Sequence, residues 1–208
     1  MVKLKVTLIP GDGIGPEVVN AAVQCVDALL DVDWHYTEIG DQAIKDFGKE
    51  LPVKALQLAK KTKITLKGPV TTPIGGGFHS VNVKLRKELG LYANVRPCKT
   101  LQGIDTPYKV DLVVIRENTE DSYSGIEFKQ GKFARILRQY HMPTNSAVAL
   151  KTISSKASKR IVDYAFKYAK QNKRKKVTAV HKANILKITD GLFAKSAREV
   201  AKKYTIKF

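Results

Sequence analysis

The segment from Lys3 to Ile9, together with the glycine-rich stretch behind it, constrains the fold most. Residues 3–9 are rich in Val, Leu and Ile, alternate as a strand does, and end in the sequence PGDGIGPE. Pro16 suits the first position of a helix, and apolar residues then recur at helical spacing as far as Leu30. A strand that turns sharply into a helix is the repeating unit of an α/β domain.

Strand-like and helix-like segments continue to alternate, which predicts an α/β fold class. The run VDLVVI at 110–115 is typical of a strand covered on both faces. Residues 125–153 carry the β-prone pieces FARILRQ and SAVALKTI around a turn-forming HMPTNS, and we expect a hairpin-like excursion there. The other expected elements are strands at 34–39, 64–66 and 177–180 and helices at 53–60, 158–169 and 191–204. The closing YTIKF resembles the start of another strand, which would need a continuation for the preceding helix to pack against.

Composition excludes some classes of protein. The longest apolar runs are far shorter than the roughly 20 residues that span a bilayer, and the first ten residues lack the apolar stretch of a secretory signal. We therefore expect a soluble, cytoplasmic protein without a membrane partner. Cys25 and Cys98 stand at no metal-ligand spacing, so we interpret both as free thiols.

The net charge of +18, from 37 Lys and Arg against 19 Asp and Glu, raises the question of a polyanionic partner. Much of the excess lies at 156–160, 170–176 and 201–207, on the polar faces or ends of expected amphipathic helices. No aromatic residues are interleaved with it for base stacking, and no nucleic-acid-binding module accompanies it. Solvated lysines explain the pattern better than nucleic-acid binding does.

The glycines of GDGIG at 11–15 follow a strand and open a helix, as in a dinucleotide-binding fingerprint. Their spacing is GxGxG, however, and the fingerprint requires GxGxxG. We interpret the motif as a tight turn that needs glycine dihedral angles.

Residues 71–97, TTPIGGGFHSVNVKLRKELGLYANVRP, gather groups that suit an anionic ligand. A surface helix would scatter such groups, so we expect a binding segment there. Arginine binds carboxylates bidentately, and several converging arginines would match a ligand with several carboxylates. The candidates are Ser80, Asn82, Arg86 and Arg96, with Arg116 and Tyr123 further along the chain. Any one of these arginines alone would more often form a surface salt bridge.

Lys182 in VHKAN follows an expected strand, as Arg116 does in VIREN. Ligands of open α/β sheets collect at the carboxyl ends of strands. In a cation-rich, partly closed site a lysine would have a lowered pKa and could act as a base. From the residues alone, a solvated loop lysine is the simpler interpretation.

Several long motifs in order give the chain a family resemblance. IPGDGIGPE, LKGPVTTPIGGG, SVNVKLRK, LYANVRPCKT, VVIRENTEDSYSGIE, ASKRI and TAVHKANILKITDGLF resemble the β-decarboxylating dehydrogenases, the isocitrate and 3-isopropylmalate dehydrogenases. The match covers essentially the whole chain. The segment SVNVKLR resembles the isocitrate-binding loop, and RENTE resembles the isocitrate branch, closest to its NAD-dependent members.

The resemblance implies roles for individual residues. Carboxylates and the hydroxyl region of isocitrate would be held by Ser80, Asn82, Arg86, Arg96 and Arg116. Tyr123 would return a proton to the enolate after carbon dioxide leaves, and Lys182 would assist removal of the hydroxyl proton, donated across a dimer interface. Thr72 and Asn184 would lie beside the nicotinamide of NAD, with NADP as the other possibility. A divalent ion, Mg²⁺ or Mn²⁺, would favour the alkoxide.

The sequence departs from the family in two ways. Family members continue with aspartates that bind the metal and with a loop that holds the adenine half of the cofactor; neither is present here, so we assign no metal ligands. Asp121 stands where many relatives have glycine. The implied architecture is a two-domain α/β fold with its C-terminal part absent. Its parts would be 1–91 in the large domain, 92–124 and 152–208 in the small domain, and 125–151 as a clasp-like dimerisation segment.

Three functions follow from these expectations. The first is oxidative decarboxylation of isocitrate to 2-oxoglutarate by a homodimer or larger homo-oligomer. Within the same class, homoisocitrate or 3-isopropylmalate would be the alternative substrate. From another class, the chain would be a truncated, noncatalytic or regulatory subunit that retains the arginines.

Overall fold

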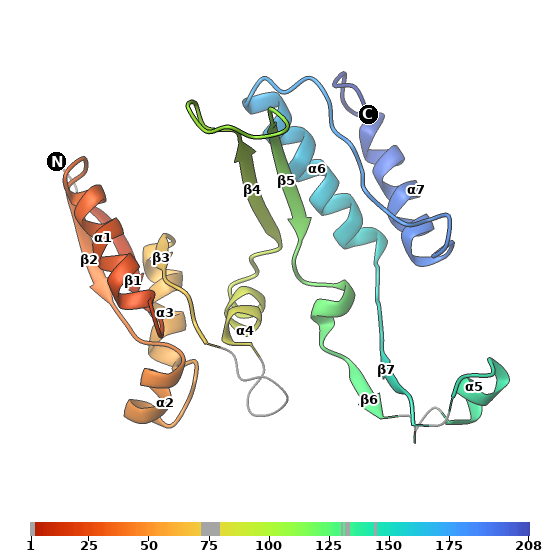
Figure 1. Ribbon diagram of the computed structural model, residues 1–208, viewed down its shortest axis with the longest axis horizontal. Coiled ribbons are helices and arrows are strands. Elements are labelled where there is room, and N and C mark those ends of the chain that lie inside the picture. The colour runs from red at the N-terminus through yellow and green to blue at the C-terminus, as the bar shows by residue number, and fades with distance from the viewer. Residues whose placement is uncertain (1–2, 72–79, 130, 132–133, 144) are drawn as a thin grey trace. The chain divides into compact units, whose positions relative to one another are not determined.

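A computed structural model of the chain describes residues 3–71, 80–129, 131, 134–143 and 145–208 (Figure 1). The chain divides into two compact units, residues 1–90 and 91–208. Both units combine helices with strands, which confirms the predicted α/β class. In the described residues no helix combines the length and the apolar character that a membrane crossing requires.

The first unit contains a parallel sheet of three strands in the order β2-β1-β3. Its central strand pairs Leu4 with Val32 on one side and Thr7 with Thr65 on the other. The elements of this unit are β1 (Leu4–Ile9), α1 (Gly15–Asp27), β2 (Val32–Tyr36), α2 (Asp41–Phe47), α3 (Val53–Thr62), β3 (Thr65–Lys67) and α4 (Val81–Glu88). The strand, glycine turn and helix at the N-terminus are therefore confirmed.

The glycine turn behind β1 is needed for close packing of backbone on backbone. Gly11 has φ +79°, and a Cβ atom there would lie 1.9 Å from the Pro69 carbonyl oxygen. The amide of Asp12 donates to the same carbonyl at 2.9 Å. A Cβ atom on Gly68 would lie 1.9 Å from the Pro10 carbonyl oxygen. The carboxyl ends of β1 and β3 are thus fastened together, as the tight-turn interpretation requires.

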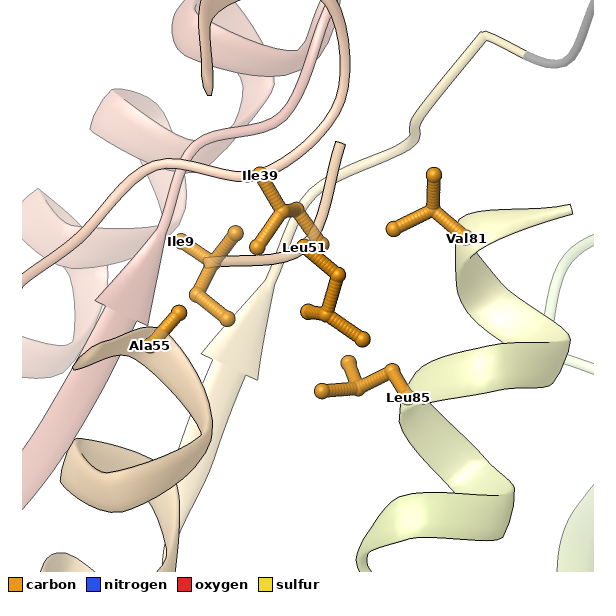
Figure 2. Close-up of a cluster of buried hydrophobic side chains, with 6 residues drawn as sticks. All are labelled: Ile9, Ile39, Leu51, Ala55, Val81 and Leu85. Atoms are coloured by element: carbon orange, nitrogen blue, oxygen red, sulfur yellow. The ribbon is translucent and has the colours of Figure 1, made fainter. Parts of the chain in front are cut away.

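Helix α4 lies in the expected binding segment 71–97, for which the sequence predicted no particular element. Val81 and Leu85, four residues apart on one helix face, are 0% and 5% exposed. They close the apolar core of the first unit, together with Ile9, Ile39, Leu51 and Ala55 (Figure 2). Burial of this face stabilises a helix whose valines at 81 and 83 suggest a strand instead.

The second unit is built on an antiparallel pair of strands, with α6 beside it and α7 against α6 (Figure 1). Phe166 is fully buried between the two helices and stacks on Tyr204 at 4.7 Å between ring centroids. The Tyr204 hydroxyl donates to Asp163 at 2.7 Å. The main elements are β4 (Ala93–Lys99), β5 (Asp111–Glu117), α6 (Ser155–Gln171) and α7 (Thr189–Ala201).

Strand β5 has one apolar face packed and the other exposed. Ile115 packs against the core of the α6 and α7 helices, whereas Leu112 and Val114 are 47% and 46% exposed. The expectation of a strand covered on both faces is therefore wrong for this unit. Alternation along a strand sends neighbouring side chains to opposite faces, and only one face lies against α6.

Between the strands and α6 lies the expected hairpin. A 3₁₀ turn, η1 (Asp121–Ser124), leads into β6 (Glu127–Lys129), which pairs antiparallel with β7 (Ala147–Ala149). The segment FARILRQ is not a strand, since residues Ala134–Gln139 form the helix α5. The strand expected at 177–180 is also wrong. The pairing there is an isolated parallel bridge between Lys176 and Lys207.

Candidate anion-binding site

The pairing register of β4 and β5 places two of the predicted arginines on one face. Asn94 lies opposite Arg116, and Arg96 lies opposite Val114. Directly opposed residues share a face, so Asn94, Arg96 and Arg116 project together. Arg96 and Arg116 are diagonal neighbours, whose separation is about 7–8 Å at the backbone. Their face is the exposed one, since the other face carries Ile115 toward α6.

The side chains on this face contact one another. The Arg96 Nε donates to the Asn94 Oδ1 at 2.9 Å, which leaves the terminal nitrogens of that guanidinium unused. The Arg116 guanidinium lies over the Tyr123 ring, 4.4 Å from its centroid, as in a cation–π contact. Within the described residues neither guanidinium forms an ion pair. Asn94, Arg96, Arg116 and Tyr123 together form the arginine cluster.

The turn behind β5 is fixed by the side chain of Glu117. Its carboxylate accepts hydrogen bonds from the Thr119 amide at 2.7 Å, the Thr119 hydroxyl at 2.6 Å and the Glu120 amide at 2.9 Å. Arg160 of α6 adds a salt bridge at 3.2 Å. Burial alone would raise the pKa of Glu117, but these hydrogen bonds outweigh it and hold the pKa below its usual value. The turn that follows Arg116 is therefore anchored to α6.

Glu120 fastens the same turn to the start of α6. One oxygen of its carboxylate accepts from the Ser154 amide at 2.7 Å, and the other accepts from the Ser154 hydroxyl. The Ser154 hydroxyl oxygen in turn accepts from the Ala157 amide at 3.1 Å and caps the helix. Tyr123 thus follows a turn that Glu117 and Glu120 anchor to α6, and this turn leads its ring to the Arg116 guanidinium.

In the first unit, helix α4 carries three further predicted residues. Ser80 precedes the helix, and Asn82 and Arg86 are four residues apart on one face. The Asn82 Oδ1 is buried and has no hydrogen-bond partner among the described residues. Burial and the nearby charge of Arg86 lower the pKa of Lys67, whereas Asp12 opposes the shift. Lys67 is the last residue of β3, and its position near Arg86 was not predicted from the sequence.

No contact with the arginine cluster is found for the other predicted residues of the second unit that the structure describes. Lys182 and Asn184 lie in the segment before α7 and are exposed. Thr72 lies outside the described residues. Arg86 belongs to the first unit and Arg96 and Arg116 to the second, so convergence of all three remains a prediction. Asn94 was missed, because its place beside Arg96 depends on a strand pairing that the sequence alone does not reveal.

The described parts of the chain offer no ready metal site. No group of three or more His, Cys, Asp or Glu side chains there is placed to hold a metal ion. Asp121, one of the acidic residues near the cluster, instead binds the Ser122 amide at 2.7 Å and an ammonium group, that of Lys151, at 3.5 Å. Its φ of +64° explains why a glycine would suit this position.

Comparison with known proteins agrees with the motifs. Residues 5–207 match the model of the isocitrate/isopropylmalate dehydrogenase family. Two Arabidopsis thaliana proteins, the mitochondrial isocitrate dehydrogenase (NAD) catalytic subunit 6 and regulatory subunit 2, are each 48% identical to this chain, over 97% and 96% of it. The chain covers 51% and 50% of these relatives, about half their length.

A solved structure shares the fold as well as the sequence. The crystal structure of isocitrate dehydrogenase from Methylococcus capsulatus superposes with a TM-score of 0.88 at 47% identity. The superposition covers 98% of this chain and 58% of that one. On the family match, the motifs and the superposition, the chain belongs to the isocitrate/isopropylmalate dehydrogenase family.

Proposed function

We propose that this chain supplies the substrate-binding part of an NAD(P)-dependent dehydrogenase that converts isocitrate to 2-oxoglutarate and carbon dioxide. The observation that carries the proposal is the arginine cluster: Arg96 and Arg116, which form no ion pair among the described residues, share one strand face with Asn94, and Arg116 lies over the Tyr123 ring. Family membership supports the reaction class, and the cluster supports a substrate with more than one carboxylate.

The geometry suits carboxylates for a physical reason. Asn94 engages only the Nε of Arg96, so the two terminal nitrogens remain available for a bidentate contact. Tyr123 orients Arg116 from one side of the guanidinium plane without consuming its hydrogen-bond donors. Holding both cations in place before the ligand arrives lowers the entropy lost on binding.

The family roles of the two proton-transfer residues are part of the same proposal. Tyr123 would return a proton to the enolate, and its ring is held against Arg116 beside the proposed carboxylate site. Lys182 would assist removal of the hydroxyl proton, and its exposed side chain is accessible for that task. Both assignments rest on the resemblance, and the arginine cluster supports the first.

NAD or NADP would accept the hydride, and Mg²⁺ or Mn²⁺ would polarise the substrate. The described residues do not assemble a site for either group, because Thr72 lies outside them and no metal-ligating cluster is found among them. We therefore assign the cofactor and the metal no residue beyond the expected Thr72 and Asn184. The chain's own side chains would bind the carboxylates and transfer the protons.

Isothermal titration of isocitrate into the 208-residue chain tests the site directly. Arg116→Gln and Arg96→Gln should each weaken binding by about 10- to 150-fold, the loss of one hydrogen bond to a charged group. The matched control is Arg174→Gln, since that arginine is paired with Asp111 at 2.7 Å at the far end of β5. Equal affinities in the wild type and the Arg116→Gln variant would refute the assignment. Parallel titrations with 3-isopropylmalate and homoisocitrate decide among the substrates.

A noncatalytic or regulatory subunit is the second candidate. It is favoured by the equal identity of the chain to a catalytic and a regulatory relative. Reduction of NAD or NADP by the chain with isocitrate and Mg²⁺ or Mn²⁺ would exclude it. Isocitrate binding that requires Arg116, without reduced cofactor above the blank, would favour it.

Assembly and location complete the proposal. We propose a homodimer or larger homo-oligomer in the cytoplasm. Sedimentation equilibrium tests the first point, because a single species of 23.1 kDa would exclude self-association. Microscopy of a tagged chain in its own cell tests the second.

A further inference from the structure

Outside the arginine cluster, the second unit contains a buried carboxylate with no role in the chemistry above. Asp190 lies in the first turn of α7 and is 7% exposed. Its Oδ2 accepts a hydrogen bond from the Lys182 amide at 2.6 Å. Its Oδ1 lies 3.0 Å from the Lys151 ammonium nitrogen. Both oxygens are therefore engaged, one by the backbone of a proposed functional residue.

The backbone of Lys182 is held on its other side as well. Its carbonyl oxygen accepts from the Ile185 amide at 3.0 Å and the Leu186 amide at 2.8 Å. The side chain, by contrast, is exposed and has no recorded ion pair within the described residues. A fixed backbone under a free side chain is what a group presented to a ligand requires.

Lys151 connects this segment to the turn that carries Tyr123. Its ammonium nitrogen lies 3.0 Å from Asp190 and 3.5 Å from the Oδ2 of Asp121, the first residue of η1. The Asp121 amide donates to the Thr152 carbonyl at 2.9 Å, next to Lys151 in the chain. One lysine thus joins the turns that bear both proposed proton-transfer residues.

We propose that Asp190 is a positioning residue for Lys182 and that Lys151 keeps it ionised for that role. The inference extends the proposed function and rests on it for the task of Lys182. An ionised carboxylate binds an amide more strongly than a neutral carboxyl does. Removing the Lys151 charge should therefore weaken the hydrogen bond between Asp190 and the Lys182 amide, although neither Asp190 nor Lys182 is itself substituted.

The charges around Asp190 support an ionised state. The groups that face it are Lys151, with Asp121 behind, and His181 from the adjacent segment. Burial by itself would raise the pKa of Asp190, but the Lys182 amide and Lys151 lower it below the ordinary value. The hydrogen bond to the Lys182 amide should therefore persist at pH values where an ordinary aspartate begins to protonate.

The experiment follows the Lys182 amide by ¹H–¹⁵N NMR during an acid titration of the 208-residue chain. In the wild type the Lys182 amide resonance should stay downfield as the pH falls to the ordinary aspartate range. In Lys151→Met its upfield movement should begin at a higher pH, and in Asp190→Asn the downfield shift should shrink at every pH. Asp190→Asn keeps the side-chain shape, so a folded protein is expected for the comparison.

Lys159→Met is the matched control, because Lys159 pairs with Glu199 of α7 at 2.8 Å but away from Lys182. Its titration should coincide with that of the wild type. The proposal is overturned if the Lys182 amide does not respond to Asp190→Asn, or if Lys159→Met shifts the titration as much as Lys151→Met. The NMR result does not depend on turnover. If the wild type does not reduce the cofactor with isocitrate, the catalytic role of Lys182 is refuted, but its positioning by Asp190 is not.

Discussion

Replacing Glu117 by Gln tests how the turn behind β5 is held. The Glu117 carboxylate accepts three hydrogen bonds from Thr119 and Glu120 and a salt bridge from Arg160, and its side chain is 19% exposed. A glutamine keeps the shape but presents an NH₂ group to some of these donors. Losing one to two hydrogen bonds to a charged acceptor, each worth about 1.5–3 kcal/mol, has a mid-range cost of about 2–4 kcal/mol, which is the expected destabilisation.

Urea unfolding followed by far-UV circular dichroism measures this loss. With an m-value of about 2 kcal/mol/M, the midpoint of the second unit should fall by about 1–2 M. Trp34, the single tryptophan, lies in β2 of the first unit, so its fluorescence reports that unit separately. Glu199→Gln is the matched control, since Glu199 forms an exposed pair with Lys159 and should change the midpoint little.

The pH dependence adds a second check with a definite sign. The folded pKa of Glu117 is lowered, so its contribution is present above the unfolded value of 4.5 and is lost as the pH falls through the folded pKa. The difference in unfolding free energy between wild type and Glu117→Gln should therefore be largest near neutrality and shrink below about pH 4.5. Equal stabilities at pH 7, or a gap that widens in acid, would refute the reasoning.

Three further predictions concern stability and are measured by the same unfolding assay. Phe166→Ala should cost about 3–5 kcal/mol, because the ring is fully buried, and a loss under 1 kcal/mol would contradict the packing described. Gly68→Ala should disrupt the first unit, because its Cβ would lie 1.9 Å from the Pro10 carbonyl oxygen, whereas Gly191→Ala, with open space in α7, should be neutral or stabilising. Ser154→Ala should cost about 1–2 kcal/mol through loss of the α6 cap, and Ser154→Thr should restore most of it.

The elements that the sequence predicted well are those with a strong local signal. The first strand, its glycine turn and α1 combine alternation, special glycine dihedrals and helical spacing in one segment. Helix α6 shows the same agreement, with Ile161, Val162 and Phe166 on its buried face. In both cases the local preference and the packed face point to the same structure.

The misses have different physical causes. No element was predicted for residues 81–88, because the contacts that decide the form of helix α4 are those of Val81 and Leu85 with the core. Residues 177–180 have β propensity, but among the described residues the pairing there is limited to the Lys176 bridge, and a strand forms by pairing. Tertiary contacts decide both segments, and a local pattern does not contain them.

The candidate site was predicted by resemblance in its residue types but not in its arrangement. Arg96, Arg116 and Tyr123 were named, and their proximity follows from the register of β4 and β5 and from the turn held by Glu117. Neither the register nor the Arg160 contact to that turn can be derived from spacing in the sequence. For the same reason Asn94 and Asp190 were not identified as neighbours of functional residues.

The register of the β4–β5 hairpin decides which side chains its exposed face presents to solvent. Sliding β4 by a single residue would turn Arg96 inward beneath α6 and bring Val95 out into water, because alternate side chains exchange faces. The misaligned hairpin would therefore lose the exposed arginine and present an apolar side chain to water at the same time. Deletions within either strand should therefore yield aggregated protein, whereas changes in length between Lys99 and Asp111 should leave the alignment intact.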